Sequence, residues 1–383
     1  MMPYFQAMPY IRLSLLIVSA IFLLPFLIKI RIKSLKTDIR RHHIMFFWTI
    51  LILISLVTGL FNQNFGVYYM TDFGYVFFGG IIYLALNQVD FNVNLLKIRD
   101  LMLVIFTIDF FANITPSIYL VVLSVSFLFL KNTNLFQIKT LLNLFFTIKY
   151  SLDINRTIFV LVIIVLILII LKKTLKRASG FFWIITIGLF LSVIFFYDVV
   201  LEQLIYVISE KSRIGLRLKQ LLDFLQGNVD YNSSYFISIT QRIQEAQLVL
   251  LSWTDSICSF LFGEGSGATI DGTKFQDQGV LQSSLTGHSK IHNIHILPFS
   301  LILRYGLGGV ILFYFLLKES IRFFLRYFFS KHTLKYKPKT IYAVYVYILI
   351  LYSMPAGSTL WADQLFFIFL ALNKKQDYKT LDG

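Results

Sequence analysis

The chain has 383 residues, of which 57% are hydrophobic and only 14% are charged, and it contains 40 Phe and 21 Tyr. A soluble domain carries roughly a quarter charged residues, so this chain lacks the polar side chains needed to cover its own surface. The formal net charge is +15, but the basic residues gather in short stretches beside apolar runs, which argues against nucleic acid as a partner. Composition therefore predicts a membrane protein.

Apolar runs that could cross a bilayer recur along the chain. The clearest lie at residues 11–30, 44–61, 157–171, 181–201 and 297–317, and weaker ones lie at 74–86, 135–150, 341–354 and 362–372. None alternates polar and apolar residues, and backbone groups in lipid must pair internally, so we expect helices rather than a barrel. As one helix, residues 101–130 would be about 45 Å long, and Asn113 and Pro116 indicate a break into two. These runs predict an all-α, polytopic integral membrane helix bundle with about 10 to 12 transmembrane helices.

Three basic stretches set the expected orientation of the bundle. Residues 31–43, 172–177 and 318–339 are rich in Lys and Arg and lie beside apolar runs. Cytoplasmic loops carry such an excess of positive charge, so segment 202–296 is expected on the opposite side. The chain then divides into an N-terminal transmembrane bundle (1–201), one large external loop (202–296) and C-terminal transmembrane helices (297–383).

The external segment is too long to be only a connection, and long loops are usually functional or disordered. Apolar residues at helical spacing predict an amphipathic helix over 208–226, with Gly227 as its C-cap. A second amphipathic helix is predicted over 238–253, with Ser238 and Gln241 forming a capping box. We expect both helices to rest on the membrane surface or to close over the bundle.

Arginines on these two helices are candidate phosphate ligands. Arg213 and Arg217 are four residues apart and share one helix face, and Arg242 lies in the first turn of the second helix. Guanidinium groups bind phosphate oxygens in a bidentate manner, which would suit a lipid-linked phosphate or pyrophosphate. The alternatives are snorkelling to lipid headgroups and a local pair between Arg242 and Glu245.

Two further motifs in the external segment suggest sites. Residues 263–267 read Gly-Glu-Gly-Ser-Gly, but Lys274 follows Thr273 in the wrong order for a Walker loop, so a flexible turn near a site is expected instead of nucleotide binding. His288, His292 and His295 lack a His-Glu-x-x-His pattern, a second cysteine and a carboxylate at ligand spacing, so no metal is expected. A histidine that carries a proton or donates a hydrogen bond fits better.

Two single residues also attract attention. Cys258 lies in an apolar stretch, which predicts a packed, inert thiol. Asp109 lies within an apolar run, and an intramembrane carboxylate is a functional hypothesis because burying its charge is costly. The alternative for Asp109 is a neutral carboxyl that is hydrogen-bonded inside the bundle.

The order of these features resembles a known family. The arginine-bearing helices are followed by Leu261-Phe262-Gly263-Glu264-Gly265-Ser266-Gly267, then by His292-Asn293, then by Arg304-Tyr305-Gly306-Leu307-Gly308-Gly309. Each motif is short, and their order over about residues 205–317 carries the likeness. The chain resembles the bacterial O-antigen polymerase and O-antigen ligase superfamily.

This resemblance implies a function and a cellular location. It implies a multi-pass protein of the bacterial inner membrane whose external loop is periplasmic. It implies a metal-independent glycosyltransferase without a cofactor that acts on an undecaprenyl-pyrophosphate-linked oligosaccharide, and the polymerase is favoured over the ligase. Membrane lipid, a chain-length regulator and a flippase are the expected partners. A lipid-linked oligosaccharide flippase is the alternative from another functional class.

The resemblance also suggests roles for individual residues. The expected catalytic residues are His292, Arg242 and Glu264, and the expected substrate-binding residues are Arg213, Arg217, Asp277, His295 and Arg304. The three helix arginines would stabilise the leaving pyrophosphate. His292 falls where the family has a histidine and would orient or deprotonate the acceptor hydroxyl. Glu264 and Asp277 are alternative bases, and the assignment between His292 and His295 stays open.

Overall fold

The computed structural model describes part of the chain. The described residues are 43–88, 95–112, 114, 117–128, 137–154, 158–159, 161–166, 237–273, 290–329, 338–356 and 366–372, together with short pieces between 202 and 228. They form helices and turns, and the only β pairing among them is an isolated antiparallel bridge between Ile270 and Ile291. The predicted all-α class is confirmed for this part of the chain.

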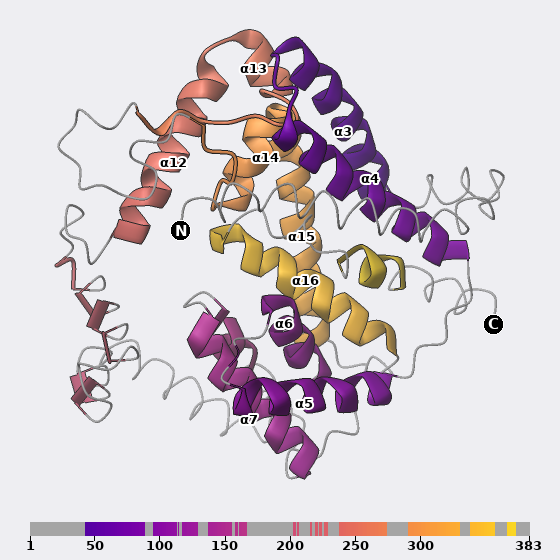
Figure 1. The fold of residues 1–383 in the computed structure, drawn as a ribbon, viewed down its shortest axis with the longest axis vertical. Coiled ribbons are helices and arrows are strands. Elements are labelled where there is room, and N and C mark those ends of the chain that lie inside the picture. Colours follow the sequence, from indigo (N-terminus) through magenta and orange to yellow (C-terminus); the bar gives the residue numbers. More distant parts are fainter. Residues whose placement is uncertain are drawn as a thin grey trace.

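Further helical pieces are described at 158–159, 161–166 and 366–372, and ten helices are named. They are α3 (His43–Phe61), α4 (Val67–Gln88), α5 (Leu95–Phe111), α6 (Ile118–Phe127), α7 (Ile138–Ile154), α12 (Ile237–Thr254), α13 (Ile257–Phe262), α14 (Leu297–Tyr305), α15 (Leu307–Phe329) and α16 (Pro338–Ala356). The helices α12, α13 and α14 and the α3–α4 turn lie at one end of the molecule (Figure 1). The helices α5, α6 and α7 lie at the opposite end, and α16 crosses between them (Figure 1).

Several helix boundaries fall where the sequence predicts them. Helix α5 ends at Phe111 and α6 begins at Ile118, so residues 101–130 are divided as expected. Ser117 caps α6, because its side chain accepts a hydrogen bond from the backbone N–H of Tyr119. The second amphipathic helix is also present as α12. The predicted helices over 11–30, 181–201 and most of 208–226 lie outside the described residues.

The prediction of a single helix over 297–317 was wrong. Helix α14 ends at Tyr305 and α15 begins at Leu307. Gly306 lies between them with φ 55°, in the left-handed region that glycine adopts readily. A Cβ atom on Gly306 would lie 2.5 Å from the backbone N of Gly263. The chain therefore breaks at Gly306, and this lets the loop after α13 approach its backbone.

A large apolar core joins both ends of the molecule. It includes Trp48 of α3, Phe106 of α5, Leu312 of α15 and Tyr345 of α16. Between α6 and α7 the core also contains polar side chains, where Ser124 Oγ donates to Asn143 Oδ1 at 2.8 Å and contacts Thr147 Oγ1.

In the portion of the chain described here, no helix combines the length and the apolar character that crossing a bilayer requires.

Candidate functional site

The loop after α13 is the centre of the candidate site. Its three glycines, Gly263, Gly265 and Gly267, have φ angles of 73°, 85° and 77°. A Cβ atom on Gly265 would lie 2.2 Å from the backbone N of Gly59 on α3, and one on Gly267 would lie 2.8 Å from the Cα of Tyr69 on α4. The loop is therefore packed against the α3 and α4 backbones. The expectation of a flexible turn at residues 263–267 was wrong. Because glycine has no side chain, the loop backbone packs directly against the backbones of α3 and α4.

Hydrogen bonds fix this loop in place. Ser266 N–H donates to the carbonyl of Ser55 at 2.9 Å, and the two serine hydroxyls are 3.0 Å apart. Glu264 N–H donates to the carbonyl of Leu303 on α14 at 2.7 Å. The loop thus connects α3 to α14, and it does not present its backbone N–H groups as a phosphate cradle.

Behind the loop lies a buried charged cluster made of Asp72, His292 and Arg304. Arg304 Nε donates to Asp72 Oδ2 at 2.9 Å, and Arg304 Nη2 donates to Asp72 Oδ1 at 3.3 Å. Arg304 Nη1 donates to Ser300 Oγ at 2.7 Å. The backbone N–H of Gly267 donates to Asp72 Oδ2 at 2.9 Å. The cluster therefore ties α4, α14 and the glycine loop together.

The environment of Asp72 keeps its carboxyl ionised. Burial opposes the charge, but the positive charge of Arg304, the neighbouring His292 and the hydrogen bonds of both residues favour it, and the pKa of Asp72 is held below its ordinary value. Asp72 precedes the apolar run 74–86, so it lies at the end of that run rather than within it. A carboxylate held in this way is a fixed negative charge beside His292.

Both ring nitrogens of His292 contact other protein groups. Nδ1 lies 3.0 Å from the carbonyl O of Ala268, which accepts a hydrogen bond from it. Nε2 lies 3.2 Å from Asp72 Oδ1 and 3.3 Å from Arg304 Nη2. The ring of Tyr68 stacks on the imidazole, with the ring centroids 4.5 Å apart. His292 is buried, so both ring nitrogens and one ring face of this predicted catalytic residue contact other protein groups.

A cavity of about 10 Å³ lies beside this cluster, lined by Ile52, Asp72, Val76, Ser266, Arg304 and Tyr305. Such a volume has room for about one water molecule. This cavity is therefore too small for a sugar or a pyrophosphate, and more exposed residues lie around the loop.

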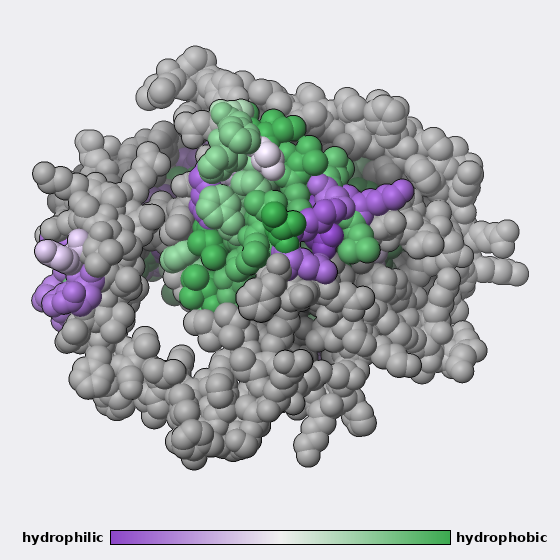
Figure 2. Space-filling view, turned by 90° about the horizontal axis from the view of Figure 1, so that it is seen from below, coloured by the Kyte–Doolittle hydropathy of each residue, from purple (hydrophilic) through white to green (hydrophobic). Residues whose placement is uncertain are grey.

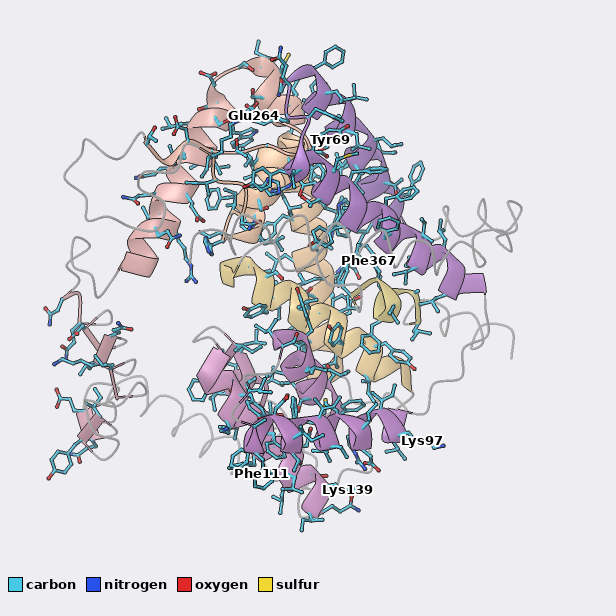
Figure 3. The ribbon with its side chains drawn as sticks, viewed as in Figure 1. Tyr69, Lys97, Phe111, Lys139, Glu264 and Phe367 are labelled. Carbon is cyan, nitrogen blue, oxygen red and sulfur yellow. The ribbon has the colours of Figure 1, made fainter. Side chains whose placement is uncertain are left out.

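Glu264 is one of these more exposed residues. Its Oε1 accepts a hydrogen bond from Ser252 Oγ at 3.0 Å, and its Oε2 accepts one from Asn62 Nδ2 at 3.1 Å. The carbonyl of Glu264 accepts a further hydrogen bond from Asn64 Nδ2 at 2.7 Å. Glu264 and Tyr69 lie together at the loop end of the molecule (Figure 3). The α3–α4 turn and α12 thus hold the Glu264 carboxylate, which keeps part of its surface open.

A second carboxylate–histidine pair lies between α12 and residues 290–296. Glu245 is fully buried on α12, and its Oε2 accepts the backbone N–H of His295 at 2.8 Å. Its Oε1 lies 2.6 Å from His295 Nδ1. The side chain of His295 is 47% exposed. The alternative of a local pair between Arg242 and Glu245 is not formed in the structure, because the Glu245 carboxylate binds His295 instead.

The remaining predicted residues are only partly placed. Arg242 is half-buried in the second turn of α12, and its guanidinium has no hydrogen bond or ion pair with any described residue. Arg213, Arg217, Asp277 and His288 lie outside the described residues. The described residues therefore place His292, Glu264 and Arg304 around the glycine loop, with Arg242 and His295 on neighbouring segments. Their catalytic and substrate-binding roles stay predictions.

The structure also describes Cys258 and Asp109. The prediction of a packed thiol was wrong, because Cys258 is exposed on α13, which has no buried residue. Asp109 is half-buried on α5, and its carboxylate has no hydrogen bond with a described residue. Within the described ranges, no three residues among His, Cys, Asp and Glu are placed to hold a metal ion.

Sequence reasoning missed Asp72 and Glu245. Asp72 is an acidic residue that directly precedes the apolar run 74–86, and a carboxylate at the end of such a run is a signal that could have selected it. Glu245 was considered only as a partner for Arg242, three residues away. Its complete burial depends on α14 packing against α12, and no local pattern contains that information.

The chain was compared with known proteins in three ways. No protein-family model, no curated protein and no solved structure matches it.

Proposed function

We propose that this chain is a glycosyltransferase of the O-antigen polymerase type, embedded in the bacterial inner membrane. It joins oligosaccharide repeat units that are carried on undecaprenyl pyrophosphate. The observation that carries the proposal is the meeting of the sequence motifs in space. Glu264 lies in the loop 263–268, and His292 binds the carbonyl of Ala268 in the same loop. Arg304 binds Asp72, whose carboxylate also accepts the Gly267 N–H.

Exposed apolar stripes on several helices support a lipid environment. Helix α3 exposes Phe46, Ile50, Leu53, Val57 and Leu60, α5 exposes Leu101, Val104, Ile108 and Phe111, and α15 exposes Leu307, Ile311, Tyr314, Ile321 and Leu325. The spacing of three, four or seven residues places each set on one helix face. Contiguous apolar stripes of this kind are suited to lipid. At the α5–α7 end, which the proposed orientation places on the cytoplasmic side, apolar residues lie beside hydrophilic ones (Figure 2).

The arrangement of charges supports the proposed orientation. The α3–α4 turn lies against the loop 263–268, and both belong to the side expected to face the periplasm. Lys97 and Lys139 lie at the opposite end of the molecule from Glu264 (Figure 3). Lys139 Nζ and Arg99 both pair with Asp100 at that end. Basic residues gathered away from the candidate site agree with the positive-inside rule.

The proposed reaction requires positive charge near the leaving group. When the growing glycan leaves its carrier, negative charge develops on the undecaprenyl pyrophosphate, and fixed cations stabilise that charge. Arg242 is half-buried on α12, and we propose that its guanidinium binds phosphate oxygens bidentately. Arg213 and Arg217 are proposed to act with it. Arg304, in contrast, is held by Asp72 and Ser300 in this structure.

The test of this function is the pattern of surface glycolipids in the host. Deleting the gene should leave lipid A-core capped by a single repeat unit, and the wild-type gene should restore a ladder of long chains on a gel. Arg242→Ala and Glu264→Gln should fail to restore the ladder at normal protein level. Glu319→Gln, which changes an exposed pair on α15, should restore it fully.

Other outcomes of this experiment identify other functions. Uncapped core with long chains accumulating on the carrier would indicate a ligase. Uncapped core with single units trapped on the carrier would indicate a flippase. An unchanged gel, with the other surface polysaccharides also intact, would contradict a role in glycan assembly altogether.

The lipid-facing stripes give a separate prediction. Spin labels attached to single cysteines at Leu53 and Ile108, in a Cys258→Ser background, should collide readily with oxygen and poorly with a polar nickel chelate. Labels at Lys139 and Arg322 should show the reverse, because these side chains are exposed at polar positions. The measurement is power-saturation electron paramagnetic resonance in lipid vesicles. Equal access of the nickel chelate to all four positions would contradict a lipid-facing surface.

A further inference from the structure

Glu245 fixes the orientation and the tautomer of His295. Its two carboxylate oxygens bind two groups of the same residue, the backbone N–H at 2.8 Å and the ring Nδ1 at 2.6 Å. A carboxylate only accepts hydrogen bonds, so Nδ1 must carry the hydrogen. In the neutral imidazole the lone pair then lies on Nε2. Glu245 is completely buried, which keeps water from competing for these hydrogen bonds.

The Nε2 atom of His295 is available to a substrate. The side chain of His295 is 47% exposed, and its Nε2 has no hydrogen bond with any described residue. A buried carboxylate that orients an imidazole with one open nitrogen is the arrangement required of a general base. The pair therefore has the geometry needed to accept a proton from an external hydroxyl.

His292 has a different arrangement. It is buried, its Nδ1 donates to Ala268 and its Nε2 lies between Asp72 and Arg304. No ring nitrogen is left to reach a substrate, and the adjoining cavity holds about one water molecule. His292 would have to leave both contacts before it could accept a proton. Its contacts suit a residue that positions the glycine loop.

A cation lies close to the Glu245–His295 pair. Arg242 and Glu245 are three residues apart on α12, so they project from neighbouring positions on the same face. Arg242 has no described partner, whereas Glu245 is committed to His295. Within the described part of the chain, helix spacing thus places a guanidinium that has no described partner near the Glu245–His295 pair. A proton acceptor and a cation are the two groups that a glycosyl transfer from a pyrophosphate carrier needs.

We propose that His295, positioned by Glu245, is the proton acceptor of the glycosyl transfer. The inference rests on the proposed function and assigns its base. Nε2 takes the proton of the acceptor sugar hydroxyl, and the oxygen forms the new bond to the anomeric carbon of the donor glycan. The bond from that carbon to undecaprenyl pyrophosphate breaks, and the pyrophosphate leaves with the electron pair. The imidazolium then releases its proton to water.

The test uses the full-length protein in lipid vesicles, with lipid-linked repeat units extracted from a host that lacks the gene. The decisive variant is His295→Asn, whose amide nitrogen can still donate to Glu245 in place of Nδ1 but offers no nitrogen lone pair. We expect kcat to fall by about 100- to 10,000-fold. KM and the thermal unfolding midpoint should stay close to wild type. Glu319→Gln, on the distant α15 surface, should keep the wild-type kcat.

Glu245→Gln tests the positioning role. If the Gln carbonyl keeps the backbone N–H of His295, its amide group must donate to Nδ1, and the hydrogen of the imidazole then moves to Nε2. We expect kcat to fall by at least about 100-fold with little change in KM, because the wrong tautomer cannot accept the proton. Added imidazole should restore part of the turnover of His295→Ala, which a purely structural role for His295 would not allow.

The outcomes separate the base assignment from the proposed function. If wild type makes chains and His295→Asn turns over at the wild-type rate, the assignment to His295 is overturned while the function stands. Loss of turnover in His292→Asn alone, at a normal unfolding midpoint, would give the role to His292. If wild type makes no chains from the lipid-linked units, the proposed function is overturned, and the assignment with it.

Discussion

Asp72→Asn should lower the free energy of unfolding by about 3 to 5 kcal/mol, because it leaves the buried guanidinium of Arg304 without its counter-charge. Arg304 is only 3% exposed, and both its Nε and Nη2 bind the Asp72 carboxylate. Gly267 N–H would also lose a charged acceptor. The measurement is the thermal unfolding midpoint of purified protein in detergent, together with the yield of monodisperse protein.

The matched control for this substitution is Asp100→Asn. Asp100 also pairs with an arginine and a lysine, Arg99 and Lys139, but its side chain is 43% exposed. Exposed pairs contribute less than about 1 kcal/mol, so this variant should melt close to wild type. Asp72→Asn with Arg304→Met should recover part of the loss, since no unpaired charge is then buried. Equal melting of Asp72→Asn and Asp100→Asn would contradict the buried cluster.

Gly265→Ala should destabilise the protein by about 2 to 5 kcal/mol, through the left-handed backbone and through overpacking. Gly265 has φ 85°, and a Cβ atom there would lie 2.2 Å from Gly59 N and 2.7 Å from Ser55 O. All of these contacts are with backbone atoms of α3, which cannot move like the end of a side chain. The measurement is again the thermal unfolding midpoint, and Gly59→Ala should show a similar loss because its Cβ would lie 2.4 Å from Ser266 O.

Two glycines serve as controls for the separate contributions. Gly227 has φ 77° but open space around its Cβ position, so Gly227→Ala tests the backbone conformation alone. We expect it to cost about 1 to 2 kcal/mol. Gly66 has neither a positive φ nor a neighbour within 4 Å, so Gly66→Ala should be close to neutral. If Gly265→Ala and Gly227→Ala have the same thermal unfolding midpoint, the packing of the loop against α3 is refuted.

Local patterns predicted the helices well. The apolar run at 44–61 became α3, the amphipathic spacing at 238–253 became α12, and the break in 101–130 followed from Asn113 and Pro116. These signals lie within one segment, and hydrophobic periodicity and helix breakers report on such segments directly. Gly306 was also a candidate helix breaker because it is a glycine. Whether a glycine ends a helix depends on which neighbouring groups approach it, and here the backbone of Gly263 does so.

The candidate site was predicted in part for the same physical reason. Glu264, His292 and Arg304 stood out because they lie in short motifs. Asp72 forms its ion pair with a residue 232 positions away, so nothing near it in the sequence identifies its partner. Cys258 illustrates the opposite error, because an apolar stretch does not reveal whether its helix faces the core or the surroundings.

The ion pair between α4 and α14 has a consequence for the synthesis of the protein. Asp72 is made 232 residues before Arg304, and at ribosomal speeds this interval lasts roughly 10 to 50 s. During that time the carboxylate has no guanidinium partner, and the docking surface for the glycine loop on α3 and α4 is uncovered. Until Arg304 has been made, the carboxyl group of Asp72 must therefore be hydrated or protonated. Degradation or chaperone binding in the cell would act on this intermediate, before the site has been assembled.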